Sequence, residues 1–267
     1  MLEFTDETAP HQISFELYGA AARVCADSPE VLAQIEPLMP PGWQPCPREA
    51  ATERLGILQE EDGTYSIYKG AIRVSEGQGL KLSLIVLDGQ LRGHIAFNSP
   101  EMTFIHAGAV AHRGAAMIFP GHSFSGKTAL VAALVRAGAT YLSDEFAVLD
   151  ENGLVHPYAK PLSLRAEDGR SQVEHHVNEL GGVAGDEALP IEMAVVTSYR
   201  PGAEWRPRRL TPGEGVLAVF SHAAPARDRP RATMQAITRA LENAVVLEGE
   251  RGDGDELADE LLGMVRS

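Results

Sequence analysis

The sequence predicts an α/β protein in which a β-rich N-terminal module, residues 1–100, precedes a domain of alternating strands and helices, residues 101–267. The first hundred residues carry short apolar runs separated by turn signals, as strand-rich segments do. After them the order becomes strand, glycine-rich loop and helix, which is typical of sheets whose strands are joined by helical crossovers. A chain of 267 residues is long enough to bury its own core.

In the N-terminal module we expect one helix followed by short strands. Ser28 can cap a helix that runs to Leu38, and Pro40-Pro41-Gly42 ends it. Asp62-Gly63 and Asp88-Gly89 place glycine where hairpin turns need a positive φ. Strands are expected at residues 64–70, 71–74 and 80–87.

The C-terminal domain is predicted to begin with two strands, residues 104–111 and 115–119, and a helix from Lys127 to Arg136 that ends near Gly138. A long apolar strand, residues 140–149, should follow and return through a turn at 150–153. Later elements are expected as a return strand at 154–155, a buried strand at 191–199 and helices at 233–244 and 255–265, the two helices separated by an acidic, glycine-rich turn.

Composition excludes several classes of protein. The net charge of -14, from 23 Lys and Arg against 37 Asp and Glu, disfavours a nucleic-acid partner. No run of about 18 apolar residues suits a membrane span, and the N-terminus lacks a secretory signal, so we expect a cytoplasmic protein without a membrane partner. The two cysteines, Cys25 and Cys46, are expected to be buried thiols rather than a disulfide or metal framework.

The strongest motif is the run Gly-His-Ser-Phe-Ser-Gly-Lys-Thr, which fits the phosphate-binding pattern G-x-x-x-x-G-K-S/T. Lys127 is expected to neutralise the β and γ phosphates of a nucleoside triphosphate, and the Thr128 hydroxyl to ligate Mg²⁺. The alternative is a fortuitous glycine-rich turn, which the strand before the loop and the helix after it argue against. The residues expected to contact the nucleotide are Gly121, His122, Ser123, Phe124, Ser125, Gly126, Lys127 and Thr128.

A magnesium nucleotide needs a second anchor, usually an acidic residue on a neighbouring apolar strand. Asp144 and Glu145 lie 17 and 18 residues beyond Lys127, inside such a strand. They are candidates for the anchor, and the alternative is a structural pair bonded to backbone amides. Arg165, with Lys160 nearby, can supply positive charge to a phosphoryl group or be a solvated loop charge.

Three segments together resemble, in order and spacing, the catalytic domain of HPr kinase/phosphorylase and its relatives: Ile105 to Ala111, Ile118 to Leu130, and Tyr141 to Glu145. The match is marked by His106, 15 residues before Gly121, and by Asp144 after the lysine. The E-x-R-G-x-G-x-x-N signature of the bifunctional enzymes is absent, which argues against phosphorylase activity and against HPr as the substrate. The leading module, whose late strands run straight into His106, is more similar to that of shorter relatives, which include lasso-peptide kinases.

The resemblance implies a phosphoenolpyruvate-carboxykinase-like P-loop domain, a mixed sheet with flanking helices, that uses ATP and Mg²⁺. Asp144 would be the general base that accepts a hydroxyl proton, with His106 close to it, and Lys127 would complete the catalytic set. Glu145, which replaces the family's second aspartate, would join Thr128 at the metal. Relatives often assemble, so a homo-oligomer is compatible with the resemblance.

The sequence is compatible with three functions. The first is an ATP- and Mg²⁺-dependent kinase that transfers the γ-phosphoryl group to a serine-type hydroxyl of a peptide, protein or small metabolite. The second is a nucleotide-binding regulatory or switch protein with weak NTPase activity. The sequence has no N-K-x-D motif, which argues against a GTPase switch. Asp144 favours catalysis, because nucleotide binding alone needs no proton acceptor. The third is a small-molecule kinase or carboxykinase-like enzyme.

Overall fold

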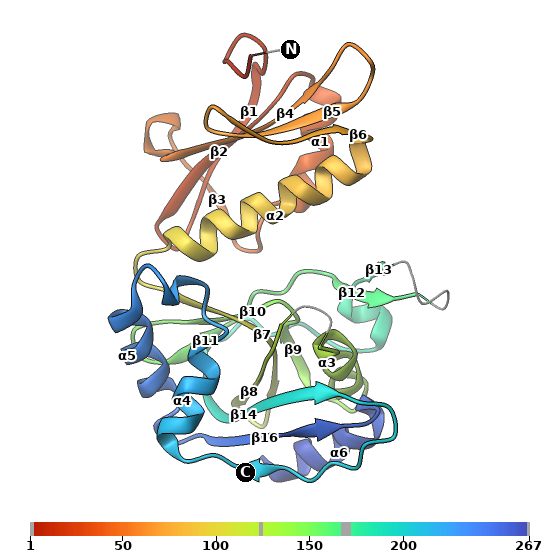
Figure 1. Ribbon diagram of the computed structural model, residues 1–267, viewed down its shortest axis with the longest axis vertical. Coiled ribbons are helices and arrows are strands. Elements are labelled where there is room, and N and C mark those ends of the chain that lie inside the picture. Colours follow the sequence, from red (N-terminus) through yellow and green to blue (C-terminus); the bar gives the residue numbers. More distant parts are fainter. Residues whose placement is uncertain (1–2, 123–124, 167–171, 266–267) are drawn as a thin grey trace. The chain divides into compact units, whose positions relative to one another are not determined.

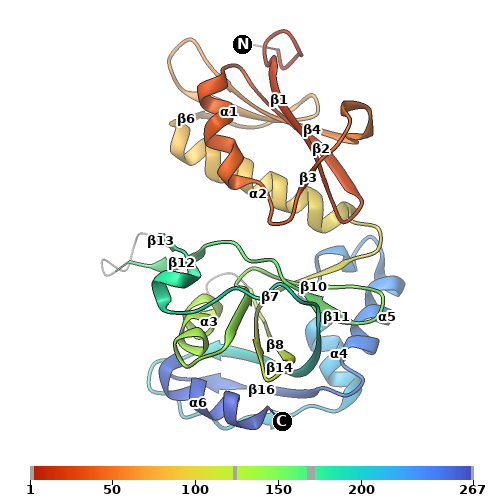
Figure 2. The ribbon, with the colours of Figure 1, turned by 180° about the vertical axis from the view of Figure 1, so that it is seen from behind.

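The computed structural model describes residues 3–122, 125–166 and 172–265. The chain divides into two compact units, Met1–Glu101 and Met102–Ser267, which are treated separately below (Figures 1 and 2). No helix among the described residues is both long enough and apolar enough to cross a membrane. Cys25 is buried, as expected, whereas Cys46 is only half-buried, and both are free thiols.

The N-terminal unit is built on a six-stranded sheet in the order β3-β1-β2-β4-β5-β6. Strands β1 and β2 form an antiparallel hairpin whose turn uses Tyr18 and Gly19, both at positive φ. Helix α1 (Pro29–Ile35) lies between β2 and β4 in sequence, which allows these two strands to pair in parallel. The strands are β1 (His11–Leu17), β2 (Ala20–Ala26), β3 (Gln44–Pro45), β4 (Glu53–Gln59), β5 (Tyr65–Lys69) and β6 (Ile72–Gln78).

Two local predictions for this unit are confirmed. The Ser28 side chain accepts a hydrogen bond from the Val31 backbone N–H and caps α1, which continues as a 3₁₀ turn over Glu36–Leu38. Gly63, at φ 82°, lies in the turn between β4 and β5. Both features depend on residues that are only a few positions apart, so they can be predicted from the local sequence.

The strand predicted at residues 80–87 is wrong, and so is the hairpin turn at Asp88-Gly89. Both segments belong to helix α2 (Leu80–Asn98), which packs against β2, β4 and β5. Leu87, Leu91 and Ile95 are fully buried at helical spacing. The short apolar run that opens the helix also alternates with polar residues, so its periodicity does not distinguish the two structures.

The C-terminal unit contains an eight-stranded mixed sheet in the order β11-β10-β7-β8-β14-β16-β15, with β9 paired to β7. Strands β8, β14 and β16 run parallel, and the other pairings are antiparallel. Strands β12 (Leu162–Arg165) and β13 (Gln172–His175) form a separate pair. The strands of the main sheet are β7 (Thr103–His112), β8 (Ala115–Pro120), β9 (Thr140–Ser143), β10 (Phe146–Leu149), β11 (Leu154–His156), β14 (Leu189–Tyr199), β15 (Arg208–Arg209) and β16 (Val245–Arg251).

Helices cover both faces of this sheet (Figure 1). Met117 and Phe119 of β8 belong to one core cluster, which contains residues of α3 (Lys127–Arg136) and α6 (Gly254–Met264). The alternate residues of β8, Ala116 and Ile118, belong to a second cluster with residues of α4 (Pro212–Phe220) and α5 (Pro230–Ala240). This period-two alternation allows helices to pack on both faces of the sheet, and a mixed sheet with flanking helices is the arrangement that the family resemblance implies.

Two predictions for this unit need correction. The single strand expected at residues 140–149 is divided into β9 and β10, because the buried Ser143 hydroxyl accepts the backbone N–H groups of Glu145 and Phe146 and turns the chain there. The acidic turn expected between the last two helices contains strand β16, and α5 ends at Ala240 instead of Ala244.

Candidate functional site

The glycine-rich loop connects the end of β8, at Pro120, to the first residue of α3, Lys127. Gly126 has φ 87°, and a Cβ there would lie 2.8 Å from Nη2 of Arg251. A Cβ on Gly121 would lie 2.8 Å from the Ser125 hydroxyl. Gly126 is therefore required by its positive φ, whereas a Cβ on Gly121 would require the Ser125 side chain to move. Two of the predicted nucleotide contacts, Ser123 and Phe124, lie outside the described residues.

The Lys127 side chain folds back over this loop. Its Nζ donates hydrogen bonds to the carbonyl oxygens of Gly121 and His122, both at 2.7 Å. The side chain is buried, and burial lowers the pKa of Lys127 to about 8, while the charge of Asp144 acts in the opposite direction. The amine therefore lies at the loop, where burial disfavours its protonated form. An anion bound there would stabilise that form.

Asp144 lies at the break between β9 and β10, where two polar side chains meet it. The Tyr141 hydroxyl lies 3.2 Å from its Oδ1, and the Thr128 side chain and the Ser163 backbone lie nearby. Burial raises the pKa of Asp144, although these three polar neighbours oppose the rise. The structure therefore brings together Asp144 and Thr128, which are 16 positions apart in the sequence.

His106 is connected to the site through its backbone. Its carbonyl accepts the Gly121 N–H at 3.2 Å, and its own N–H donates to the His222 carbonyl at 2.8 Å. In the ladder between β7 and β10, His106 pairs with Phe146, and the neighbouring Ala107 N–H donates to the Glu145 carbonyl at 3.0 Å. The predicted neighbourhood of His106, Gly121 and the acidic pair is therefore present in the backbone.

Arg165 and Lys160, the two basic residues considered as sources of positive charge for a phosphoryl group, have different environments. Arg165 is exposed at the end of β12. Lys160 contributes its backbone carbonyl, which accepts the Tyr141 hydroxyl at 2.8 Å. Tyr141 is therefore held between this carbonyl and Asp144, and burial raises its pKa. It stays neutral at physiological pH, and its single hydroxyl proton lies between these two acceptors, the shorter contact being the one to the Lys160 carbonyl.

Sequence analysis missed Arg251, the largest side chain in the fully buried set, with 1% exposure. It ends β16, and its Nη2 donates to the Gly126 carbonyl at 2.7 Å while Nη1 donates to the Gly252 carbonyl at 2.9 Å. Burial lowers the pKa of Arg251, against the charges of Tyr199 and Asp253. Its contact with the loop joins residues 125 positions apart, and no local motif marks it.

Arg251 helps to orient one peptide group of the loop. The Gly126 carbonyl accepts from Arg251 and also from the Leu130 backbone N–H at 3.2 Å, so it points along α3. In a trans peptide, the N–H of the following residue points the opposite way. The Lys127 N–H is consequently directed out of the helix N-terminus, where backbone N–H groups bind anions.

A pair of histidines adjoins the loop, and only its first member was predicted. The rings of His122 and His222 are 4.6 Å apart between centroids. Nδ1 of His222 is buried and has no hydrogen-bond partner in the described part of the chain. Burial, followed by the charges of His122 and Lys127, lowers the pKa of His222 to about 4. His222 is therefore neutral at physiological pH and offers a polar nitrogen beside the loop.

These groups fit a triphosphate and a magnesium ion. The loop glycines, the N-terminus of α3, Lys127 and Arg251 form the electropositive part, and Asp144 lies near Thr128. Within residues 3–122, 125–166 and 172–265, no group of three or more His, Cys, Asp or Glu side chains is arranged to hold a metal by itself.

Comparisons with known proteins give little beyond this geometry. No family model and no curated protein matches the chain. Among solved structures, it is similar to the HPr(Ser) kinase/phosphatase from Coxiella burnetii, with 15% sequence identity and a TM-score of 0.34, over 61% of this chain and 93% of that chain. A likeness at this level is distant and decides neither family nor activity. The functional argument therefore depends on the residues of the site.

Proposed function

We propose that the C-terminal unit binds Mg-ATP at the loop of residues 121–128 and transfers the γ-phosphoryl group to a serine-type hydroxyl of a peptide, protein or small metabolite. The observation that carries this proposal is the proximity of the Thr128 side chain to the Asp144 carboxylate beside a P-loop. It combines a candidate magnesium-binding hydroxyl with a half-buried carboxylate. A loop that only binds phosphate needs no such partner.

Binding of the triphosphate follows from groups that are already directed at the loop. Backbone N–H groups at the start of α3 and the charged form of Lys127 would hold the β and γ phosphates. Arg251 adds positive charge behind Gly126 and has no carboxylate in hydrogen-bond contact among the described residues. Because an isolated buried charge is costly, phosphates near Gly126 would stabilise it.

Magnesium, when bound, would neutralise charge on the transferring phosphoryl group. Thr128 and Glu145 are the ligands that we propose for it. Asp144 would accept the proton of the attacking hydroxyl, since its raised pKa makes it a better base than an exposed carboxylate. Because Asp144 lies near Thr128, it would also be close to a metal held there, so Asp144 has a second candidate role as a ligand.

The two roles of Asp144 differ in their magnesium dependence. If Asp144 is the proton acceptor, Asp144→Asn should lower the transfer rate at every magnesium concentration while leaving the half-saturating concentration unchanged. If it is a ligand, the half-saturating magnesium concentration should rise several-fold and the rate should recover in excess magnesium. Thr128→Ala is the matched control, since it should raise the magnesium requirement in either case.

The proposal is tested by incubating the full chain with Mg-ATP and a panel of serine-containing peptides and small hydroxyl compounds, followed by mass spectrometry. A gain of one phosphate on an acceptor, absent with Lys127→Ala, is the expected result. Release of inorganic phosphate with every acceptor left unmodified would overturn the kinase proposal and favour the alternative, a regulatory nucleotide-binding protein with weak NTPase activity.

A further inference from the structure

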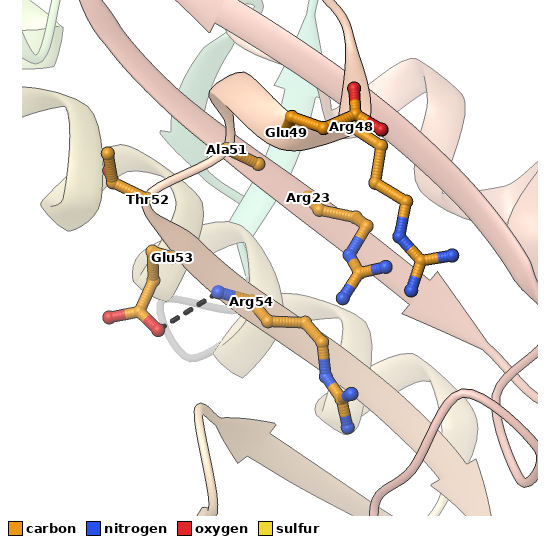
Figure 3. Close-up of a pocket in the computed structure, with 7 residues that line it drawn as sticks. All are labelled: Arg23, Arg48, Glu49, Ala51, Thr52, Glu53 and Arg54. Atoms are coloured by element: carbon orange, nitrogen blue, oxygen red, sulfur yellow. Dashed lines mark hydrogen bonds between the residues drawn. The ribbon is translucent and has the colours of Figure 1, made fainter.

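The N-terminal unit contains a cluster of three arginines that the proposed function does not use. Arg23 lies on β2, Arg48 on a 3₁₀ turn (Arg48–Ala50) and Arg54 on β4, and their guanidinium groups point to the same side (Figure 3). The parallel register of β2 and β4 places Arg23 directly opposite Arg54. Neighbouring strands are only about 4.8 Å apart, so these like charges repel unless an anion lies between them.

The carboxylate of Asp6 lies among the three guanidinium groups and partly neutralises their charge. Nη1 of Arg23 and Nη1 of Arg54 lie 3.3 and 3.2 Å from Oδ1 of Asp6, and Arg48 contacts Oδ2. The segment that carries Asp6 is held by Phe4, which stacks on Tyr68 with ring centroids 5.0 Å apart and whose carbonyl accepts from Arg54. The three guanidinium groups and the Asp6 carboxylate together leave two surplus positive charges. The chain as a whole, by contrast, has a net charge of -14.

A hollow of about 310 Å³ adjoins the three arginines. Figure 3 shows that the carboxylates of Glu49 and Glu53, which also line it, are turned away from the guanidinium groups. Glu53 is engaged elsewhere, because its Oε1 accepts the Arg54 backbone N–H at 2.9 Å. In the described part of the chain, Nε and one Nη of both Arg23 and Arg48 make no hydrogen bond and remain available as donors.

We propose that Arg23, Arg48 and Arg54 form a binding site for a dianionic phosphate group, with Asp6 as its internal stand-in. A phosphate monoester carries a charge of about -1.5 to -2 at pH 7 and three acceptor oxygens, which matches two surplus charges and several unused donors. Guanidinium groups suit phosphate through paired, planar donors. The ligand is a phosphomonoester, either free or on the side chain of a peptide, and the site is independent of the P-loop.

The test is a calorimetric titration of the full chain with O-phosphoserine, and in a second arm with a phosphoserine peptide and its unphosphorylated form. Lys127→Ala should retain binding, which separates this site from the P-loop. The double variant Arg23→Gln/Arg54→Gln should weaken binding by about tenfold or more for each guanidinium removed. Arg73→Gln, an arginine of the same unit that pairs with Glu60 and Glu76, is the matched control and should bind normally.

Asp6→Asn gives the most specific result, because removal of an internal competitor should strengthen phosphoserine binding several-fold. If the arginines only tether the N-terminal segment, this variant should lower the melting temperature without improving binding, and that outcome would overturn the proposal. Binding that persists in the double variant, or that disappears in Lys127→Ala, would overturn it equally. Should the double variant fold poorly, the half-exposed Arg48→Gln replaces it with the same expected direction.

The two arms separate the sources of the phosphate. Tighter binding of the phosphopeptide than of O-phosphoserine indicates a modified side chain, and equal binding indicates a free phosphomonoester. Binding of neither probe to the wild-type chain or to Asp6→Asn contradicts the proposal. None of these outcomes depends on kinase activity. A result that refutes the arginine site would therefore leave the proposed P-loop function intact, and the reverse also holds.

Discussion

Replacement of Arg251 by glutamine should weaken Mg-ATP binding while leaving the fold largely intact. The change removes the 2.7 Å charge-assisted hydrogen bond to the Gly126 carbonyl and a positive charge behind the loop. The charge acts on the bound phosphates through the Gly126 peptide group, and a charge-assisted interaction of this kind contributes about 1.5–3 kcal/mol. Because each 1.4 kcal/mol corresponds to a factor of ten, the dissociation constant should rise about 10- to 150-fold.

Stability should respond far less than affinity. Arg251 is 1% exposed, but its hydrogen-bond partners are backbone carbonyls and not a carboxylate that would be left buried and charged. Removing a buried charge also relieves its desolvation. We therefore expect the free energy of unfolding, measured by urea denaturation without nucleotide, to change by no more than about 1–2 kcal/mol.

The assay is a calorimetric titration of Mg-ATP into wild type, Arg251→Gln and Arg251→Lys, together with a control in Arg200. Arg200→Gln removes an exposed arginine that pairs with Glu250 at 2.7 Å, and it should bind as wild type does. Arg251→Lys keeps the charge but cannot span two carbonyls, so its affinity should be intermediate. Wild-type affinity in Arg251→Gln would refute the reasoning, as would a loss of stability as large as the loss of affinity.

Three further predictions concern the same unit. Burial lowers the pKa of Lys127 to about 8, so its charge is lost as the pH rises through that value. Mg-ATP affinity should then fall by up to about tenfold per pH unit above pH 8, whereas Lys127→Arg, which stays protonated, should give a flat profile; equal slopes would contradict this. Asp144→Asn should bind Mg-ATP normally but transfer phosphate at least about 100-fold more slowly, and a normal single-turnover rate would remove Asp144 as the base. Gly108→Ala should destabilise the fold by about 1–3 kcal/mol in urea denaturation, because its Cβ would lie 2.5 Å from Val131 of α3. Gly213→Ala, whose Cβ meets nothing within 4 Å, is its control and should be neutral or slightly stabilising.

The parts of the site that were predictable depend on short-range patterns. The strand Ala115–Pro120 and the helix Lys127–Arg136 are confirmed, and both were predictable because glycine placement and apolar periodicity are local signals. Asp144 was also found from its spacing after Lys127. The structure adds its contact with Thr128 and its location in a turn made by the Ser143 hydroxyl, which an apolar strand pattern does not reveal.

The missed parts depend on contacts between distant segments. Arg251 reaches Gly126 across 125 positions, and its strand, β16, was hidden in what looked like a polar turn. Helix α2 was mistaken for a strand because its first turns alternate, whereas its buried residues follow a period close to four. The cluster of Arg23 and Arg54 depends on the register of β2 and β4, which no local signal in either strand specifies.

The most direct test of the proposed function is a calorimetric titration of Mg-ATP into the wild-type chain and Lys127→Ala. Lys127 donates to the loop carbonyls at 2.7 Å and lies where the β and γ phosphates would bind, so its loss removes a charge and its hydrogen bonds. We predict one ATP bound per wild-type chain and an affinity about 100-fold or more lower in the variant. Equal affinities in the two proteins, or no binding by the wild type, would contradict the assignment of this loop as a nucleotide site.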